Sequence, residues 1–146
     1  MNVPRIYLDT SILVKRYVKE EGSAIADEYF HQAERGESVI CLSEINLGEA
    51  AVVFDKYSRK MDIDARNRMQ VMLSELRSLE RSSSVEIYPV DSHTLRKAIK
   101  IVLEYHIYVV DAIQLETCIE AGATLFCSGD TELNAIARRI GIETVP

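Results

Sequence analysis

The stretch RIYLDTS, residues 5–11, begins with four residues typical of a strand and passes at once into an acid and two hydroxyl side chains. The same order of a short apolar run followed by polar residues returns at residues 38–42 and 123–127, and the second of these runs leads into Ser128-Gly129-Asp130. Strands that alternate with longer helical runs are typical of an α/β domain with a parallel sheet. In such sheets the functional site lies beyond the carboxyl ends of the strands.

Helices are predicted between the strands from apolar residues at helical spacing and from capping residues. We expect them over residues 11–19, 23–34, 43–59, 62–81, 91–105, 112–120 and 131–140, with further strands at residues 85–90 and 142–145. The helix over residues 62–81 carries an apolar stripe of Met69, Met72, Leu73 and Leu76. That stripe could pack on the core of the domain or form a symmetric homodimer.

The composition is that of an ordinary globular domain, with 146 residues of which 47% are apolar and 27% charged. This length predicts one domain over residues 1–146. No apolar run reaches the roughly 18 residues that a membrane-spanning helix needs, and none at the N-terminus has the length of a signal peptide. We therefore expect a cytoplasmic protein.

The formal net charge of −6 argues against a protein that holds nucleic acid by bulk charge alone. A local basic rim remains compatible with it. The candidates are Lys15, Arg16, Lys19, Lys56, Arg59, Lys60, Arg66, Arg68, Arg96, Lys97 and Lys100, each of which could equally lie on a solvated helix face.

Several kinds of site are not supported by the sequence. The three cysteines, Cys41, Cys118 and Cys127, and the three histidines have no spacing typical of a structural zinc site, although a disulfide stays open. There is no glycine-rich nucleotide loop and no nucleophile elbow. A phosphoryl-accepting receiver domain would need an acidic pair after the first strand and a late lysine, and both are missing.

Four acids are the candidate ligands of a metal site. Asp9 ends the first strand, Asp130 follows the strand at residues 123–127, and Asp111 precedes a helix. Glu49 lies in INLGEAAVVF, residues 45–54, a helix that is apolar nearly all round and is predicted to be buried. A buried carboxylate needs a cation or strong hydrogen bonds as partner.

Each acid also has a purely structural interpretation. Asp9 and Asp130 could be helix caps or turn residues, although Ser11 could cap the first helix in place of Asp9. Asp111 with Gln114 matches a capping box, and Glu49 could lie at the edge of the core and reach solvent. Singly these signals are weak, but together they predict carboxylates at two strand ends, one helix start and one buried helix.

These residues resemble the PIN-domain family of nucleases, and in size and layout the VapC-type toxins of toxin–antitoxin pairs. The matching pieces are Asp9-Thr10-Ser11, Glu49-Ala50, Asp111-Ala112 and Ser128-Gly129-Asp130, whose order and spacing follow the family over essentially the whole chain. The resemblance implies a three-layer α/β/α fold and a Mg²⁺- or Mn²⁺-dependent endoribonuclease that commonly dimerises. It also implies inhibition by a small antitoxin whose tail enters the acidic site.

The residue types agree with this chemistry, because Mg²⁺ prefers oxygen ligands and usually takes only one or two carboxylates. Asp9 and Asp111 are expected as direct ligands, and Asp130 as a third or second-metal ligand. Glu49 is expected to bind through water or to orient the attacking water. Ser11 and Ser128 are expected to hydrogen-bond the carboxylates. Two alternatives stay open, a housekeeping RNA- or DNA-processing nuclease with the same site and a non-catalytic nucleic-acid-binding module.

Overall fold

The structure, a computed structural model, describes residues 3–145 and is built on one parallel sheet. Strand β1 (Arg5–Leu8) pairs with β2 (Val39–Ser43) on one side and with β4 (Leu125–Cys127) on the other. Strand β3 (Val85–Tyr88) pairs with β2, so the order across the sheet is β3-β2-β1-β4. The predicted parallel sheet is confirmed, and the carboxyl ends of all four strands lie at the same edge.

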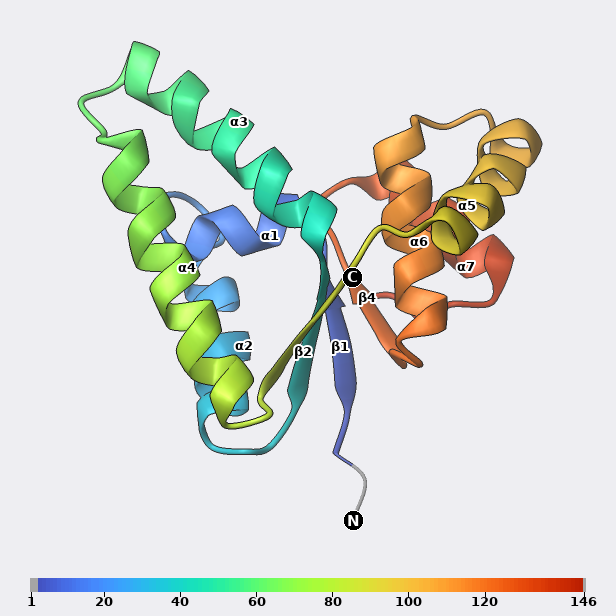
Figure 1. Cartoon of the computed structure of the whole chain (residues 1–146), viewed down its shortest axis with the longest axis horizontal. Coiled ribbons are helices and arrows are strands. Elements are labelled where there is room, and N and C mark those ends of the chain that lie inside the picture. The colour runs from blue at the N-terminus through green and yellow to red at the C-terminus, as the bar shows by residue number, and fades with distance from the viewer. Residues whose placement is uncertain (1–2, 146) are drawn as a thin grey trace.

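Helices cover both faces of this sheet (Figure 1). One layer holds α1 (Thr10–Leu13), α2 (Ser23–Glu34), α3 (Glu44–Lys60) and α4 (Ala65–Arg81), with the short 3₁₀ turn η1 (Val14–Arg16) after α1. The other layer holds α5 (Ser92–Tyr105), α6 (Val109–Glu120) and α7 (Thr131–Ile140). The three-layer α/β/α arrangement predicted from the sequence is therefore confirmed.

The two cores follow from the alternation of side chains along the strands. Ile6 and Leu8 point into one core, which they share with Phe30, Phe54 and Met72 of the first layer. Tyr7 lies between them in sequence and points into the opposite core, formed with Cys41, Phe126, Leu115 and Leu133. The Tyr7 and Phe126 rings stack there with their centroids 5.7 Å apart, which ties β1 to β4.

Several predicted element boundaries are wrong. The helix expected over residues 11–19 is only α1 followed by a 3₁₀ turn, after which Tyr17 and Val18 both enter the core. The long helix begins at Ala65 and not at Asp62, because the side chain of Asp64 accepts a hydrogen bond from the backbone N–H of Asn67 and caps it. The strand expected over residues 142–145 is a single bridge between Thr144 and Phe126.

The apolar stripe of α4 mostly belongs to the core. Met72 and Leu76 are fully buried and Leu79 is buried beside them, so Met72 and Leu76 are not available for a dimer contact. Leu73 keeps 38% of its surface exposed and the neighbouring Val71 keeps 44%. A homodimer stays a prediction, and of this stripe Leu73 remains exposed while Met69 is partly buried.

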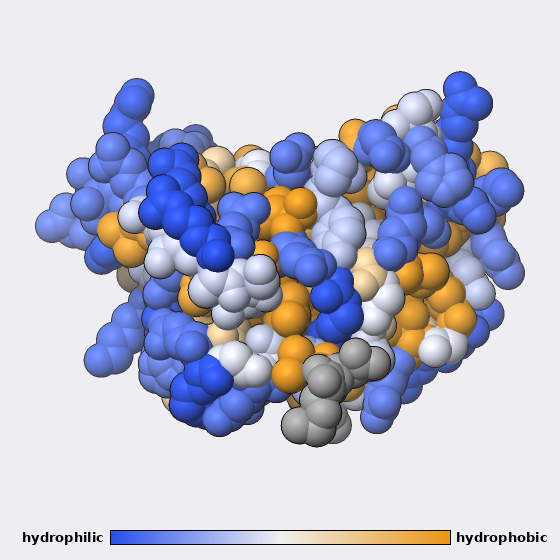
Figure 2. Space-filling view, turned by 60° about the horizontal axis from the view of Figure 1, so that its bottom comes forward, coloured by the Kyte–Doolittle hydropathy of each residue, from blue (hydrophilic) through white to orange (hydrophobic). Residues whose placement is uncertain are grey.

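The surface and the thiols are ordinary in the described part of the chain. No helix within residues 3–145 combines the length and apolar character needed to cross a membrane. The three cysteines are buried free thiols, so no disulfide links them. Seen from the end at which the strands begin, hydrophilic side chains cover most of the surface, and apolar ones show between them (Figure 2).

Candidate active site

Asp9 stands at the carboxyl end of the central strand β1. Its backbone N–H donates to the carbonyl of Cys127 at 2.9 Å, which fixes it beside the end of β4. Its Oδ2 atom accepts hydrogen bonds from the hydroxyls of Ser11 at 3.0 Å and Ser128 at 2.6 Å. Neither Ser11 nor Asp9 caps α1 through its side chain. No donor within residues 3–145 occupies Oδ1, so that oxygen of a buried carboxylate is free for a ligand.

Asp130 is the N-cap of α7, as its structural interpretation predicted. Its Oδ1 atom accepts from the backbone N–H groups of Glu132 and Leu133 at 3.0 and 3.1 Å. Its own N–H donates to the Ser128 hydroxyl, which in turn donates to Asp9. Ser128 therefore links the two acids, while Oδ2 of Asp130 accepts no hydrogen bond from the described residues.

Asp111 is not the cap that the sequence pattern suggested. Helix α6 begins earlier, at Val109, because Ile107 and Val109 pack against α5, and the N-cap position is Tyr108. Asp111 therefore lies within the first turn, and its carboxylate accepts no hydrogen bond from residues 3–145. Burial, and then the charges of Asp9, Glu49 and Asp130, raise its pKa to about 6. The structure thus brings all four acids to one end of the sheet.

Glu49 is half-buried, because only one side of α3 faces the core. On the other side of the helix, Val52 is 56% exposed. The prediction of a helix buried all round is therefore wrong. The Oε1 atom of Glu49 accepts from the hydroxyl of Thr10 at 2.7 Å and from the amide of Gln114 at 3.4 Å. Burial raises the pKa of Glu49, the hydrogen bond from Thr10 opposes that rise, and the charge of Asp9 adds to it.

A buried polar network that the sequence did not indicate holds Glu49 in place. The hydroxyl of Tyr7 donates to Oδ1 of Asn46 at 2.6 Å, and Nδ2 of Asn46 donates to Thr10 at 2.8 Å and to Gln114 at 2.7 Å. Every bond runs in the same sense, toward Glu49. The signal that could have revealed it was the presence of Asn46 and Gln114 within apolar runs, where a polar side chain needs a buried partner.

Comparison with known proteins identifies the family. The family model described as PIN domain matches residues 6–139. The chain belongs to the PIN-domain family. Nucleases with a PIN domain are typically metal-dependent hydrolases. This agrees with the resemblance seen in the sequence. A comparison of the sequence with curated proteins gave no match.

Solved structures share the PIN fold at low sequence identity. The protein PAE2754 of Pyrobaculum aerophilum has 18% identity and a TM-score of 0.65, over 99% of this chain and 92% of that one. VapBC2 of Rickettsia felis, solved with a DNA fragment from its promoter, has 18% identity and a TM-score of 0.63, with 97% of each chain covered. VapC20 of Mycobacterium tuberculosis, a sarcin–ricin loop cleaving toxin, has 16% identity and a TM-score of 0.63, over 89% of this chain and 93% of that one.

The acids of this PIN domain fit a divalent cation by their chemistry. Carboxylate oxygens are the ligands that Mg²⁺ and similar hard cations prefer, and free oxygens remain on Asp9, Asp111 and Asp130. The mutual repulsion that raises the pKa of Asp111 is the kind that a cation relieves. Within residues 3–145, however, no three His, Cys, Asp or Glu side chains stand close enough to form a closed set of ligands.

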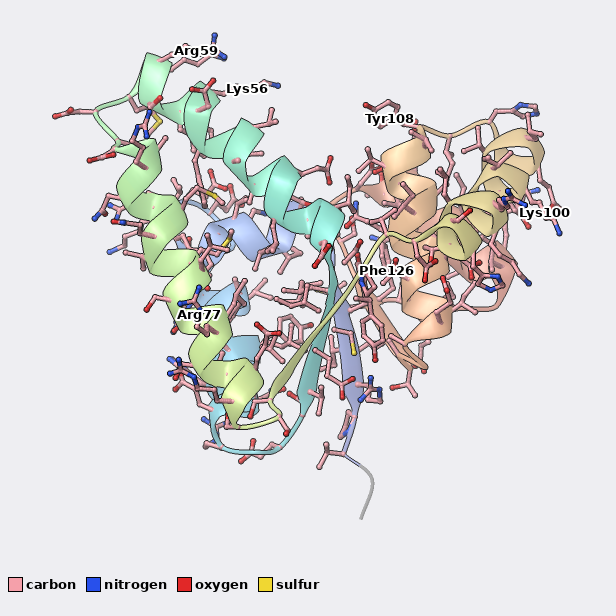
Figure 3. The ribbon with its side chains drawn as sticks, viewed as in Figure 1. Lys56, Arg59, Arg77, Lys100, Tyr108 and Phe126 are labelled. Atoms are coloured by element: carbon pink, nitrogen blue, oxygen red, sulfur yellow. The ribbon has the colours of Figure 1, made fainter. Side chains whose placement is uncertain are left out.

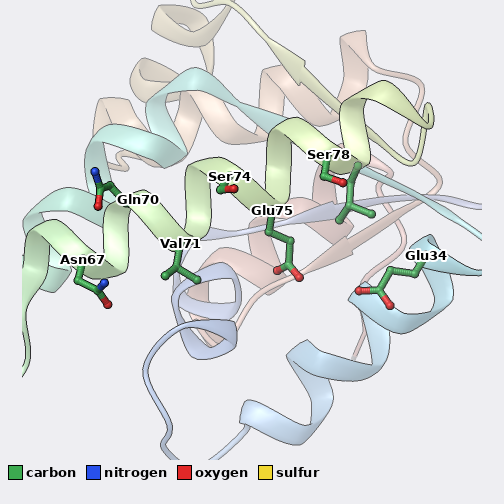
Figure 4. A pocket seen from close by; sticks show the side chains of 8 residues that line it. Glu34, Asn67, Gln70, Val71, Ser74, Glu75 and Ser78 are labelled. Atoms are coloured by element: carbon green, nitrogen blue, oxygen red, sulfur yellow. The ribbon is translucent and has the colours of Figure 1, made fainter.

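Two cavities help to locate the site of the PIN domain. One of about 210 Å³ lies against Asp111 and Asp130 and is closed by residues from α7 and by Tyr108, which lies at the start of α6 (Figure 3). Another of about 600 Å³ lies between α2 and α4, with Glu34 and Glu75 on its two sides (Figure 4). None of the four acids lines the larger one. The four acids and the smaller cavity therefore define the candidate active site.

Proposed function

We propose that this PIN domain is a Mg²⁺- or Mn²⁺-dependent endoribonuclease, and that it acts as the toxin of a toxin–antitoxin pair in the cytoplasm. The observation that carries the proposal is the gathering of Asp9, Glu49, Asp111 and Asp130 at the carboxyl end of the sheet, where three of them raise the pKa of the fourth. Such repulsion destabilises the fold, and a bound cation relieves it, so a cluster of this kind favours a metal site.

Each of the four acids would have its own role at the metal site. Asp9 and Asp111 would bind the cation directly, and Asp130 would be a third ligand or would hold a second ion. A bound cation supplies charge that polarises the scissile phosphate and lowers the pKa of a water molecule. Ser11 and Ser128 hold the carboxylate of Asp9 by its Oδ2 atom, which keeps Oδ1 turned to the site.

Glu49 would orient the attacking water. Thr10 and Gln114 fix its Oε1 atom, and the rest of the network fixes them in turn. The opposite oxygen, Oε2, accepts no hydrogen bond from the described residues and can accept one from water. A carboxylate held on one side in this way keeps its direction while the other side meets the substrate.

The test is cleavage of RNA by purified protein. Cleavage of single-stranded or structured RNA should require Mg²⁺ or Mn²⁺ and stop in chelator. Asp9→Asn and Asp111→Asn should each lose activity by about a hundredfold or more, as removal of one well-placed charge-stabilising group does. The matched control is Asp55→Asn, a change on the exposed side of α3. Full activity in both site variants would refute the assignment.

A growth assay distinguishes a toxin from a processing nuclease and from a non-catalytic binding module. A toxin should arrest growth when expressed alone and should be neutralised by a small antitoxin from a neighbouring gene, whereas Asp9→Asn should be harmless. A processing nuclease with the same acids would cleave RNA without growth arrest. A non-catalytic binding module would bind RNA without cutting it in any metal.

For assembly we propose a symmetric homodimer that uses α5 in place of the α4 stripe. Leu95, Ile99 and Leu103 repeat every four residues on α5 and are 40%, 44% and 72% exposed, so they form one apolar line at the surface. Leu103→Glu should lower the mass measured by light scattering at micromolar concentration. Leu73→Glu on α4 serves as the control, and a monomeric wild type would refute the dimer.

A further inference from the structure

A basic cavity lies beside the candidate active site, in a chain whose net charge is −6. Its volume is about 470 Å³, and it is formed by η1, the start of α2 and the side of α4. Its charged lining consists of Lys15, Arg16, Lys19 and Arg68 against a single acid, Asp27. The excess of positive charge makes it a place for an anion.

One of these cations already has its partners within the fold. Arg16 forms ion pairs with Asp27 at 2.9 Å, Glu75 at 2.8 Å and Glu34 at 3.6 Å, and its guanidinium also lies over the ring of Phe30. It therefore neutralises the one acid of the cavity and braces α2 against α4. Its charge is not available to a ligand.

The other three cations have no carboxylate partner among residues 3–145. Neither Lys15, Lys19 nor Arg68 forms an ion pair there. The Nε atom of Arg68 is buried and no described group accepts its hydrogen bond. A buried guanidinium N–H without an acceptor is costly, so an acceptor from outside the chain fits this position.

Lys15 connects the cavity to the four acids. A Cβ atom placed on Gly129 would lie 3.9 Å from Nζ of Lys15 and 3.5 Å from the hydroxyl of Ser11. The ammonium group of Lys15 thus lies next to the loop that carries Asp130. Lys15 also follows Ser11, which donates a hydrogen bond to Asp9, by four positions. An anion in the cavity would therefore meet the active site at Lys15.

We propose that Lys15, Lys19 and Arg68 bind a phosphate of the RNA strand that neighbours the scissile one, with Lys15 nearest to the acids. This inference rests on the proposed function and deepens it. Four carboxylates repel a polyanionic strand, so an acidic nuclease needs cations close to its metal site to hold the backbone. Arginine and lysine are the usual partners of phosphate oxygens.

The experiment measures binding without cleavage. A short, fluorescein-labelled single-stranded RNA is titrated with the protein in chelator, by anisotropy, from about 50 to 200 mM NaCl. The variants are Lys15→Gln, Lys19→Gln and Arg68→Gln, with Lys15→Arg to restore the charge. The control is Lys100→Gln, which makes the same charge change on α5, on the opposite side of the molecule from α4 (Figure 3).

The expected result is specific to binding of phosphate. Each site variant should weaken binding several-fold and reduce the slope of log affinity against log salt by up to about 0.7, the value for complete loss of one neutralised phosphate on a single strand. Lys15→Arg and Lys100→Gln should keep the wild-type slope. Thermal melting of every variant checks that its fold is intact, and a variant that melts early is replaced by the corresponding Met substitution.

The outcomes separate the two proposals. If wild type binds and cleaves RNA while Lys15→Gln, Lys19→Gln and Arg68→Gln all match Lys100→Gln, the cavity does not hold the strand and this inference alone is overturned. The cavity would then fit a different anion, such as an acidic segment of a protein partner. If wild type neither binds nor cleaves RNA, both the inference and the proposed function are overturned.

Discussion

The substitution Asp111→Asn should stabilise the metal-free protein at neutral pH and leave it unchanged in acid. In the folded protein the pKa of Asp111 is raised from 3.8 to about 6, first by burial and then by three neighbouring carboxylates. Each pKa unit is worth about 1.4 kcal/mol, and solvent screening at this half-buried site lowers the effect, so the ionised form costs roughly 1 to 3 kcal/mol above pH 7. Asparagine removes the charge, and the carboxylate that it replaces accepts no hydrogen bond from residues 3–145.

The sign follows from proton binding. Between pH 4 and pH 6 the folded Asp111 holds a proton that the unfolded chain has released, so the free energy of unfolding falls as the pH rises through this window. The wild-type curve should therefore drop below that of Asp111→Asn by about 1 to 3 kcal/mol between pH 4 and pH 7. Glu49, whose pKa is also raised, adds a change of the same sign in both proteins.

Urea unfolding in chelator at a series of pH values measures this difference. Asp62→Asn, a change at an exposed position before α4, should keep the wild-type profile. Saturating Mn²⁺ should raise the wild-type stability by about 2.7 kcal/mol at a hundredfold excess over its dissociation constant, and should raise that of Asp111→Asn by less. Parallel curves for wild type and Asp111→Asn at all pH values would refute the reasoning.

Three further predictions concern stability. Asp130→Ala should cost about 0.5 to 2 kcal/mol through loss of the α7 cap, and Asp130→Ser should restore that stability in a thermal melt without restoring the response to Mn²⁺. Gln114→Leu should lower the free energy of unfolding in urea by about 1 to 3 kcal/mol, because it removes the acceptor of a hydrogen bond from Asn46. An unchanged stability would mean that this hydrogen bond does not stabilise the fold. Leu76→Ala should cost about 2 to 5 kcal/mol, and Leu73→Ala less than about 1; equal losses would contradict the burial of this stripe.

The fold was predictable because its signals are local. Each strand is a short apolar run, and the polar residues that follow it mark the edge of the sheet where the chain turns. Asp9 and Asp130 could therefore be placed by position alone, at the ends of β1 and β4. Period-two alternation in β1 also separates the two cores without any knowledge of the partners.

What escaped prediction depends on contacts between distant segments. The true start of α6 is set by packing of Ile107 and Val109 on α5, so the capping-box pattern at Asp111 was misleading. The network from Tyr7 through Asn46 to Gln114 joins β1, α3 and α6, and no spacing in the sequence encodes it. The burial of Glu49 was overestimated for the same reason, because its apolar neighbours do not all face the core.

The hydrogen bond from Ser128 to Asp9 spans 119 positions of the chain and has a consequence for the order of events during synthesis. Asp9 is made before its partners in β4 and α7, and Ser128 follows it only 119 positions later in the chain. Contacts of such long range cannot form until both segments have left the ribosome. Before β4 has been made, Asp9 therefore lacks its hydrogen bond from Ser128. On the proposed function, the active site forms only when β4 pairs with β1.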